Sequence, residues 1–336
     1  MRKCIFIFSL LTLPQLNAGI FTCLAKLLGF NKKQTAQVPI DDAPAATPLA
    51  HYSPYAEREF NGGLNRVRVT QRVENGEKIS HRSPINNSPE GWAALEHQSK
   101  LLDTINPNND TPYLLKNYGK VEFSDGSSAY EMEYIEGESA YSLLNRHLPE
   151  SFKKSGQKQY FTKFLAWTEV FLGSATALNK LHEEGVTHAD VKLANYLVTE
   201  DGRMVIMDLS GSILRDGNNT LLAPPRIEVT YELLPPELNP KALKLDQFNF
   251  KTDEYTLCKD MESFFILLDP RPKPSGGWLL SSKKRLWKKR KTFYNKVKKE
   301  LMNIALNQDP KKRKIDLVSY LQELKTTLQV LSQNEE

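Results

Sequence analysis

The sequence predicts an α+β fold with two lobes, in which a small β-rich lobe precedes a larger helical lobe. Strand-like segments dominate the folded part of the chain up to Ile135, and one helical segment interrupts them. After Gly137 the apolar residues recur mostly at helical spacing. With 336 residues, of which 40% are hydrophobic, the chain is long enough for two lobes that share a cleft.

The first residues have the composition of an export signal. Arg2 and Lys3 precede an apolar run, and small residues follow around Ala18. We therefore predict a signal peptide over residues 1–18 and an exported or secreted protein. A membrane anchor is the alternative interpretation, because a second apolar stretch continues to Phe30, and an ordinary apolar tail is the third.

Residues 19–55 are predicted to contain this second apolar stretch and a linker. The linker part contains four prolines and no apolar period. The chain has three cysteines, of which Cys258 alone falls in the predicted folded body. A disulfide within that body is therefore excluded, and its core must hold the fold together.

Residues 56–135 are predicted to form the small lobe. Asn75-Gly76 predicts a tight hairpin turn, because both residue types tolerate a positive φ. Ser88 followed by Pro89 predicts a helix start with an N-cap and a first-turn proline. The predicted elements are strands at 66–73 and 78–82, a helix at 88–102, and strands at 120–123 and 129–135.

Residues 136–336 are predicted to form the large lobe. A long amphipathic helix is expected over 160–184, with Phe164, Trp167 and Phe171 on or near one face. The elements that follow are short strands at 196–198 and 204–207, and helices at 253–268, 294–306 and 315–331.

Polar residues that suit phosphate chemistry lie between the long helix and the end of the second short strand. They are His188, Asp190, Lys192, Asn195 and Asp208. Asn195 and Asp208 follow adjacent segments and can hold Mg²⁺, a hard ion that prefers oxygen ligands. Asp190 can accept or orient the proton of an attacking hydroxyl, and Lys192 can offset charge on a transferring phosphoryl group.

This segment resembles the catalytic loop of the eukaryotic-type protein kinase superfamily, specifically its serine/threonine branch. The resemblance implies a two-lobed protein-kinase-like fold, ATP and Mg²⁺ as cofactors, and a protein substrate. It also implies that Asp190 is the catalytic base and that Lys192 faces the phosphate. Asn195 and Asp208 are then the magnesium ligands.

Further segments extend the resemblance from Phe60 to Leu331. Met132, Glu133 and Tyr134 match the hinge, whose backbone binds adenine in the family. The other matches are Pro235-Pro236-Glu237 at the close of the activation segment, Asp253 at the start of the central buried helix, and the late motif Asp309-Pro310-Lys311-Lys312-Arg313. In the family, the arginine of the late motif, here Arg313, pairs with the glutamate that closes the activation segment, here Glu237.

The predicted nucleotide site departs from the family pattern. Gly62 and Gly63 supply two glycines where the family has three, and Arg82 occupies the position of the phosphate-binding lysine. Lys78 is the alternative cation on the same strand, and arginine is not a conservative exchange at a tight site. Glu96, in the middle of the predicted helix, is the best candidate to pair with this cation, the alternative being a solvated acid.

The segment after the catalytic loop departs from the pattern as well. Ser210 replaces the glycine that normally follows Asp208 by two residues. Ala189 replaces the arginine that grips an activation-loop phosphate, which implies activity without that phosphorylation. Thr220, Thr230 and Tyr231 remain candidate phosphorylation sites, although Ser and Thr in loops are usually only solvated.

A basic run at 283–299 holds ten Lys or Arg in seventeen residues. It is interpreted as a docking surface for an acidic partner or an anionic membrane, or as a solvated helix face. No specific nucleic acid is predicted, and the sequence does not indicate an oligomeric state.

The leading functional hypothesis is an active Ser/Thr protein kinase. A pseudokinase that acts as a nucleotide- or partner-binding scaffold is the alternative, and a small-molecule kinase is the third. An exported kinase without disulfides predicts delivery into a host cell, where ATP is present.

Overall fold

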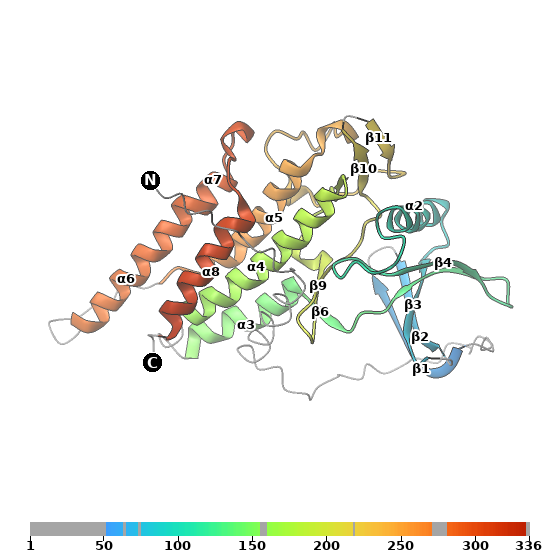
Figure 1. Cartoon of the computed structure of the whole chain (residues 1–336), viewed down its shortest axis with the longest axis horizontal. Coiled ribbons are helices and arrows are strands. Elements are labelled where there is room, and N and C mark those ends of the chain that lie inside the picture. The colour runs from blue at the N-terminus through green and yellow to red at the C-terminus, as the bar shows by residue number, and fades with distance from the viewer. Residues whose placement is uncertain are drawn as a thin grey trace, which may run out of the picture.

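The structure of the chain is a computed structural model that describes residues 52–62, 65–72, 75–154, 160–217, 219–270 and 281–333. Strands and helices are both well represented in an α+β fold (Figure 1). The predicted signal peptide, most of the predicted linker and Gly63 lie outside the described residues.

The first part of the fold is an antiparallel sheet of five strands in the order β1-β2-β3-β5-β4. The strands are β1 (Tyr52–Gly62), β2 (Asn65–Arg72), β3 (Lys78–Pro84), β4 (Asn117–Glu122) and β5 (Ser128–Glu133). The four strands predicted in this region are confirmed. Because β1 begins at Tyr52, regular structure starts before the predicted end of the linker at residue 55.

The register of the sheet brings three positions onto one face. Val69 on β2 is opposite Ser80 on β3, and Ser80 is opposite Met132 on β5. Directly opposed residues share a face of a sheet, and all three are buried. Arg82 lies two residues after Ser80 and therefore belongs to this face as well.

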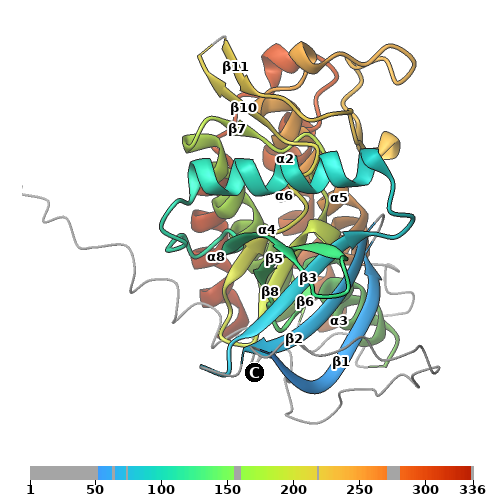
Figure 2. The ribbon, with the colours of Figure 1, turned by 90° about the vertical axis from the view of Figure 1, so that its right-hand side faces the viewer.

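The helix α2 (Pro89–Ile105) crosses the sheet part (Figure 2). It begins as predicted, since the Ser88 hydroxyl accepts a hydrogen bond from the Gly91 N–H at 3.1 Å and Pro89 opens the first turn. Leu95 and Leu102 are completely or almost completely buried on its apolar face.

The second part of the fold is mostly helical. Its helices are α3 (Ala140–Lys154), α4 (Tyr160–Glu183), α5 (Phe250–Phe265), α6 (Ser281–Val297), α7 (Asn303–Ala305) and α8 (Leu317–Gln333). Short strands join them: β6 (Gly137–Ser139), β7 (Val186–Thr187), β8 (Tyr196–Thr199), β9 (Met204–Ile206), β10 (Ile213–Asp216) and β11 (Asn219–Leu222). None of the described helices has both the length and the hydrophobicity needed to cross a bilayer.

The core of the helical part is centred on α4. Phe164, Trp167 and Phe171 are fully buried, as their helical spacing predicts. Trp167 lies edge-on to both phenylalanine rings, with ring centroids 5.7 and 5.2 Å apart. The helix α8 packs along α4 (Figure 1).

A buried ion pair joins these two helices. The Lys325 ammonium of α8 lies 3.4 Å from the Glu169 carboxylate of α4, and neither side chain is more than 5% exposed. Burial raises the pKa of Glu169, and the charge of Lys325 opposes that rise. The folded state therefore holds a proton that the unfolded state releases, and this carboxyl makes stability fall as the pH rises through its raised pKa.

Lys325→Met is expected to lower the free energy of unfolding by about 3 kcal/mol near neutral pH, because it leaves a buried carboxylate without its cation. The loss should shrink on acidification, since Glu169 can then be protonated. Urea unfolding at a neutral and an acidic pH measures both effects. Lys180→Met, which breaks the exposed pair with Glu183, is the control. A loss of unfolding free energy that does not depend on pH would contradict this role of the ion pair. So would a double variant, Lys325→Met/Glu169→Gln, that is no more stable than Lys325→Met alone.

Candidate active site

The loop that carries the predicted catalytic residues is anchored by Asp253 in the first turn of α5. The Asp253 carboxylate accepts hydrogen bonds from the backbone N–H groups of His188 at 2.7 Å and Ala189 at 3.0 Å. It also lies 3.0 Å from Nε2 of His182 at the end of α4. Asp253 is 1% exposed, so these donors replace the water that it loses.

Two residues of the site hold a left-handed backbone conformation. Ala189 has φ +69° and Asp208 has φ +57°. This region costs a non-glycine residue free energy, so the surrounding contacts must enforce it. At Ala189 the hydrogen bond to Asp253 does so, and the small side chain fits a buried position. The strain sits directly beside Asp190.

Asp190, Lys192 and Thr230 form a compact polar cluster. One Asp190 oxygen accepts a hydrogen bond from the Thr230 hydroxyl at 2.8 Å, and the other lies 2.5 Å from the Lys192 ammonium. Lys192 is also 3.3 Å from the Thr230 hydroxyl. A carboxylate, a cation and a hydroxyl thus converge, although Thr230 is 38 residues from Lys192 in the chain. The sequence marked Thr230 only as a candidate phosphorylation site.

Asn195 is fixed by the loop itself. Its side-chain nitrogen donates to the Asp190 carbonyl at 3.0 Å, which leaves the amide oxygen for a ligand. Its own carbonyl accepts the Met207 N–H at 2.8 Å, so the residue directly before Asp208 is tied to Asn195. One carboxylate and one amide oxygen form a donor set that suits Mg²⁺.

The Asp208 carboxylate is exposed and contacts Ser210. It accepts a hydrogen bond from the Ser210 hydroxyl at 2.8 Å, and the same hydroxyl lies 3.1 Å from a Glu228 oxygen. The serine at this position therefore connects the carboxylate to a residue far along the following segment.

Arg82 supplies a positive charge on the shared face of the sheet. Burial lowers the pKa of its guanidinium, and the charge of Asp208 opposes that shift. Its Nε is buried and has no hydrogen-bond partner among the described residues. A buried donor without a partner is costly, and an anion such as a phosphate would satisfy it.

Curated relatives of the chain are serine/threonine kinases. Mitogen-activated protein kinase kinase kinase 20 of Arabidopsis thaliana is 25% identical over 178 residues, which cover 52% of this chain and 47% of that protein. Serine/threonine-protein kinase WNG2 of Toxoplasma gondii is 31% identical over 119 residues, or 34% of this chain and 19% of that kinase. No family model matches the chain.

Serine/threonine-protein kinase PknH of Mycobacterium bovis is 27% identical over 169 residues, or 50% of this chain and 25% of that kinase. These matches support a protein-kinase-like superfamily for the chain. It spans about half the length or less of the relatives that it matches.

Two cations of the kinase-like chain were candidates for the phosphate-binding position, and they lie in different surroundings. Lys78 opens β3, is 47% exposed and pairs with the Glu136 carboxylate close to the hinge. Arg82 lies further along β3, within the electrostatic influence of Asp208.

The predicted pairing of Glu96 with the phosphate-site cation is wrong. The Glu96 side chain is 52% exposed, and its carboxylate lies 2.5 Å from the Lys100 ammonium one turn later on α2. The inward position belongs to Gln98, which is buried and whose amide nitrogen contacts the Met132 sulfur at 3.3 Å. Gln98 lies three residues after Leu95 and four before Leu102, so helical spacing places it on the same face as these buried leucines.

The residues predicted to form the hinge lie where the sheet part passes into the helical part. The Met132 carbonyl accepts the Ser80 hydroxyl at 3.0 Å, and the Tyr134 N–H donates to the Lys78 carbonyl at 3.2 Å. The Glu133 carboxylate pairs with Arg203 at 3.2 Å, which ties the residue before β9 to the end of β5. Gly62 ends β1 opposite Asn65 of β2.

A hydrogen-bonded bridge joins α2 to the catalytic loop. The His97 ring lies 2.7 Å from the Ser212 carbonyl, and the Ser212 hydroxyl donates to the His188 carbonyl at 3.2 Å. Burial lowers the pKa of His97, which favours the neutral ring. The sheet part and the loop are therefore connected through the segment that follows Asp208.

The pairing of Glu237 with Arg313, implied by the family resemblance, is confirmed. The guanidinium binds both carboxylate oxygens, at 2.7 and 2.8 Å. Arg313 is 3% exposed on its side chain and stacks over the Tyr255 ring at 4.3 Å. This contact fixes the end of the segment that begins at Asp208.

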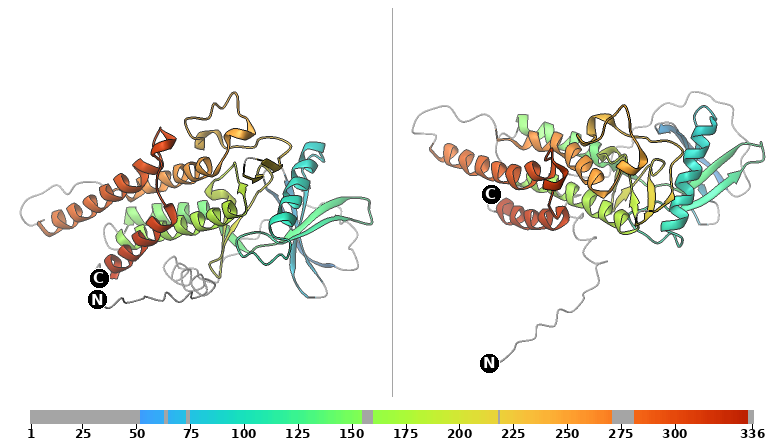
Figure 3. Two further views of the ribbon diagram at one scale, coloured as in Figure 1. Left: turned by 45° about the horizontal axis from the view of Figure 1, so that its top comes forward. Right: turned by 90° about the horizontal axis from the view of Figure 1, so that it is seen from above.

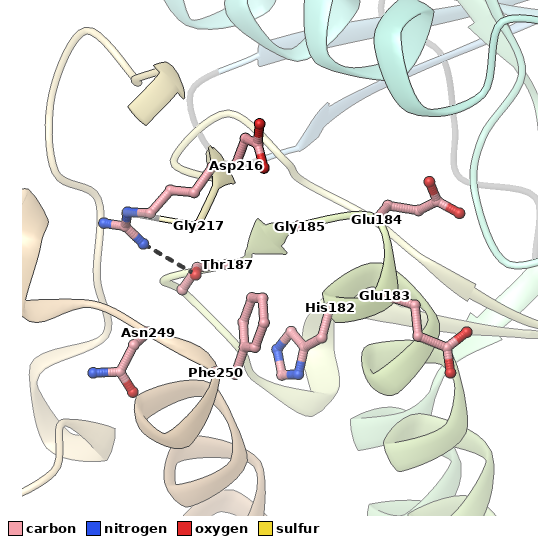
Figure 4. A pocket seen from close by; sticks show the side chains of 10 residues that line it. His182, Glu183, Glu184, Gly185, Thr187, Asp216, Gly217, Asn249 and Phe250 are labelled. Carbon is pink, nitrogen blue, oxygen red and sulfur yellow. Dashed lines mark hydrogen bonds between the residues drawn. The ribbon is translucent and has the colours of Figure 1, made fainter. Parts of the chain in front are cut away.

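A cavity of about 500 Å³ is lined by residues at the end of α4, on β7 and β10, and at the start of α5 (Figure 4). His182 and Phe250 stack in its wall with ring centroids 4.3 Å apart. Arg215 borders it and donates to the Phe248 and Leu245 carbonyls at 2.9 and 2.7 Å. These contacts support the anchor, and the cavity contains none of the predicted site residues.

Asp253→Asn is expected to lower the free energy of unfolding by about 2–3 kcal/mol. The amide keeps the side-chain volume, but it offers one acceptor oxygen and places a donor against other donors. Urea unfolding monitored by tryptophan fluorescence measures the loss. Asp246→Asn, an exposed change of the same chemistry, should stay within about 0.5 kcal/mol of the wild type. Equal effects of the two changes would contradict the anchoring role.

Proposed function

We propose that the chain is an active Ser/Thr protein kinase that transfers the γ-phosphate of ATP to a hydroxyl of a protein substrate. The observation that carries this proposal is the cluster in which Lys192 and Thr230 both contact the Asp190 carboxylate. We assign the sheet part and the helical part to the two lobes of a kinase fold, with ATP between them.

In this proposal Asp190 accepts or orients the proton of the attacking hydroxyl. Lys192 and Thr230 hold the carboxylate in place from two sides, which limits its rotation before substrate arrives. Lys192 also offsets the negative charge on the transferring group. The strained backbone at Ala189 and its bond to Asp253 set the position of Asp190.

Asn195 and Asp208 would hold Mg²⁺, which neutralises phosphate charge when bound. Their carboxylate and amide oxygens match the ligands that this ion prefers. Arg82 would bind a phosphate through its unsatisfied Nε. Met132, Glu133 and Tyr134 would border the adenine, and Gly62 would lie near the phosphates.

The alternative is a pseudokinase that binds nucleotide or a partner without transfer. Two observations favour it: Arg82 stands in place of a lysine, and the inward position of α2 holds Gln98 instead of a carboxylate. A neutral amide cannot balance the charge of Arg82. We favour activity because the groups that act on the hydroxyl are complete and in contact. Export and delivery into a host cell stay predictions.

Replacing Thr230 should separate activity from scaffolding. Thr230→Val removes the hydroxyl at Asp190 and is expected to lower the rate of phosphate transfer about tenfold to a hundredfold, whereas Thr230→Ser keeps it within a few-fold. Asp190→Asn should abolish transfer. The measurement is incorporation of radiolabelled γ-phosphate from Mg²⁺-ATP by the full chain, into itself and into a generic protein substrate such as casein.

Thr220→Val on β11 is the matched control and should leave the rate unchanged. Thermal stabilisation of the wild type by Mg²⁺-ATP is recorded in parallel. Thermal stabilisation by Mg²⁺-ATP without any phosphate transfer would favour the pseudokinase scaffold. Phosphate transfer retained in Asp190→Asn would contradict the proposed role of Asp190.

A further inference from the structure

The helix α6 (Ser281–Val297) differs from the other helices in its charge. It carries eight Lys or Arg and no Asp or Glu in its seventeen residues. Its inner face packs on the helical core: Phe293 lies edge-on to Phe161 and Phe164, and Tyr294 stacks on Phe265 with ring centroids 4.5 Å apart. The helix is thus firmly seated, and its polar side faces outward.

The outward face of α6 and of the turn after it is cationic. Its exposed basic residues are Lys284, Arg285, Lys288, Lys289, Lys296, Lys298 and Lys299. Within the described part of the chain, Lys284, Arg285, Lys288 and Lys299 make no ion pair, and Lys296 has only a distant one with Glu300 at 3.9 Å. Seven positive charges therefore stand close together with little compensation, which costs free energy unless an anion approaches.

An exposed aliphatic patch adjoins this face. Ile266 is 57% exposed and Leu267 is 39% exposed, in the turn that follows α5. The end of this turn is held beside α6, because the Asp269 carboxylate lies 2.7 Å from the Lys291 ammonium and the Trp287 indole N–H donates to the Pro270 carbonyl. Apolar and cationic groups thus meet along one edge of the helical part.

We propose that this surface, formed by the outward face of α6 with Ile266 and Leu267, binds the face of an anionic lipid bilayer. Lysine-rich segments are attracted to anionic headgroups by charge alone, and exposed aliphatic side chains enter the boundary with the acyl chains. A nucleic acid offers the charge but no apolar layer for the two aliphatic residues. The lipid bilayer satisfies both features.

The position of α6 suits this role. It lies along the edge of the helical part farthest from the sheet, away from the catalytic loop (Figures 1 and 3). A flat membrane can therefore cover α6 while the site at Asp190 stays open to a substrate. The proposal does not depend on whether the chain transfers phosphate.

The test is co-sedimentation of the full chain with vesicles of phosphatidylcholine alone and of phosphatidylcholine with about 30% phosphatidylserine. The readout is the difference between the two vesicles, which removes any contribution of the apolar N-terminal segment. The wild type is expected to prefer the anionic vesicles, and the preference should decline at high salt. Lys284→Glu/Lys288→Glu/Lys299→Glu should weaken binding about a hundredfold, since each cation contributes about fivefold.

A variant with the same charge change elsewhere, Lys241→Glu/Lys244→Glu/Lys314→Glu, is the control and should bind within a few-fold of the wild type. Ile266→Ser/Leu267→Ser should weaken binding to the anionic vesicles without changing its salt dependence. Equal losses in the two triple variants would overturn the proposal. The proposal would also be overturned if the wild type bound both vesicles equally but bound a random DNA duplex through the same lysines.

Discussion

The arrangement of the site depends on one buried carboxylate, that of Asp253. An ionised group in the core is unfavourable unless donors surround it, and here the donors are the backbone of the catalytic loop and the ring of His182. The loop in turn needs these acceptors to hold Ala189 in a strained conformation. The start of α5 and the catalytic loop therefore stabilise each other, and Asp190 is placed as a result.

From this anchor the constraint spreads in two directions. Towards the sheet, Ser212 connects His188 with His97 on α2. Towards the end of the chain, Arg313 clamps Glu237 in a bidentate pair. The segment from Asp208 to Glu237 is also held near its start, where the Ser210 hydroxyl contacts both Asp208 and Glu228. These contacts order the segment without a phosphate group, in keeping with alanine in place of the family's arginine at position 189.

The sequence predicted most of the fold, because strand alternation, capping residues and helical spacing are local signals. It also located the loop from His188 to Asn195, whose residues are close in the chain. The sequence did not predict that Thr230 contacts Asp190, because only the folded chain brings that hydroxyl to the carboxylate. The charge of Glu96 favoured it as the partner of the cation, but its side chain is exposed and Gln98 occupies the buried position of α2. Local patterns also could not show that Lys78 pairs with Glu136 while Arg82 feels the charge of Asp208, because tertiary contacts set these surroundings.

We propose that Asp190, Lys192 and Thr230 act on a substrate hydroxyl, and that Arg82 binds phosphate in place of the family's lysine. A crystal structure of the full chain with Mn²⁺ and a non-hydrolysable ATP analogue tests it most directly, with the anomalous signal locating the metal. We expect the metal between Asp208 and Asn195, and a phosphate within hydrogen-bond distance of the Arg82 guanidinium. A nucleotide whose phosphates lie away from both Arg82 and Asp208 would contradict the account.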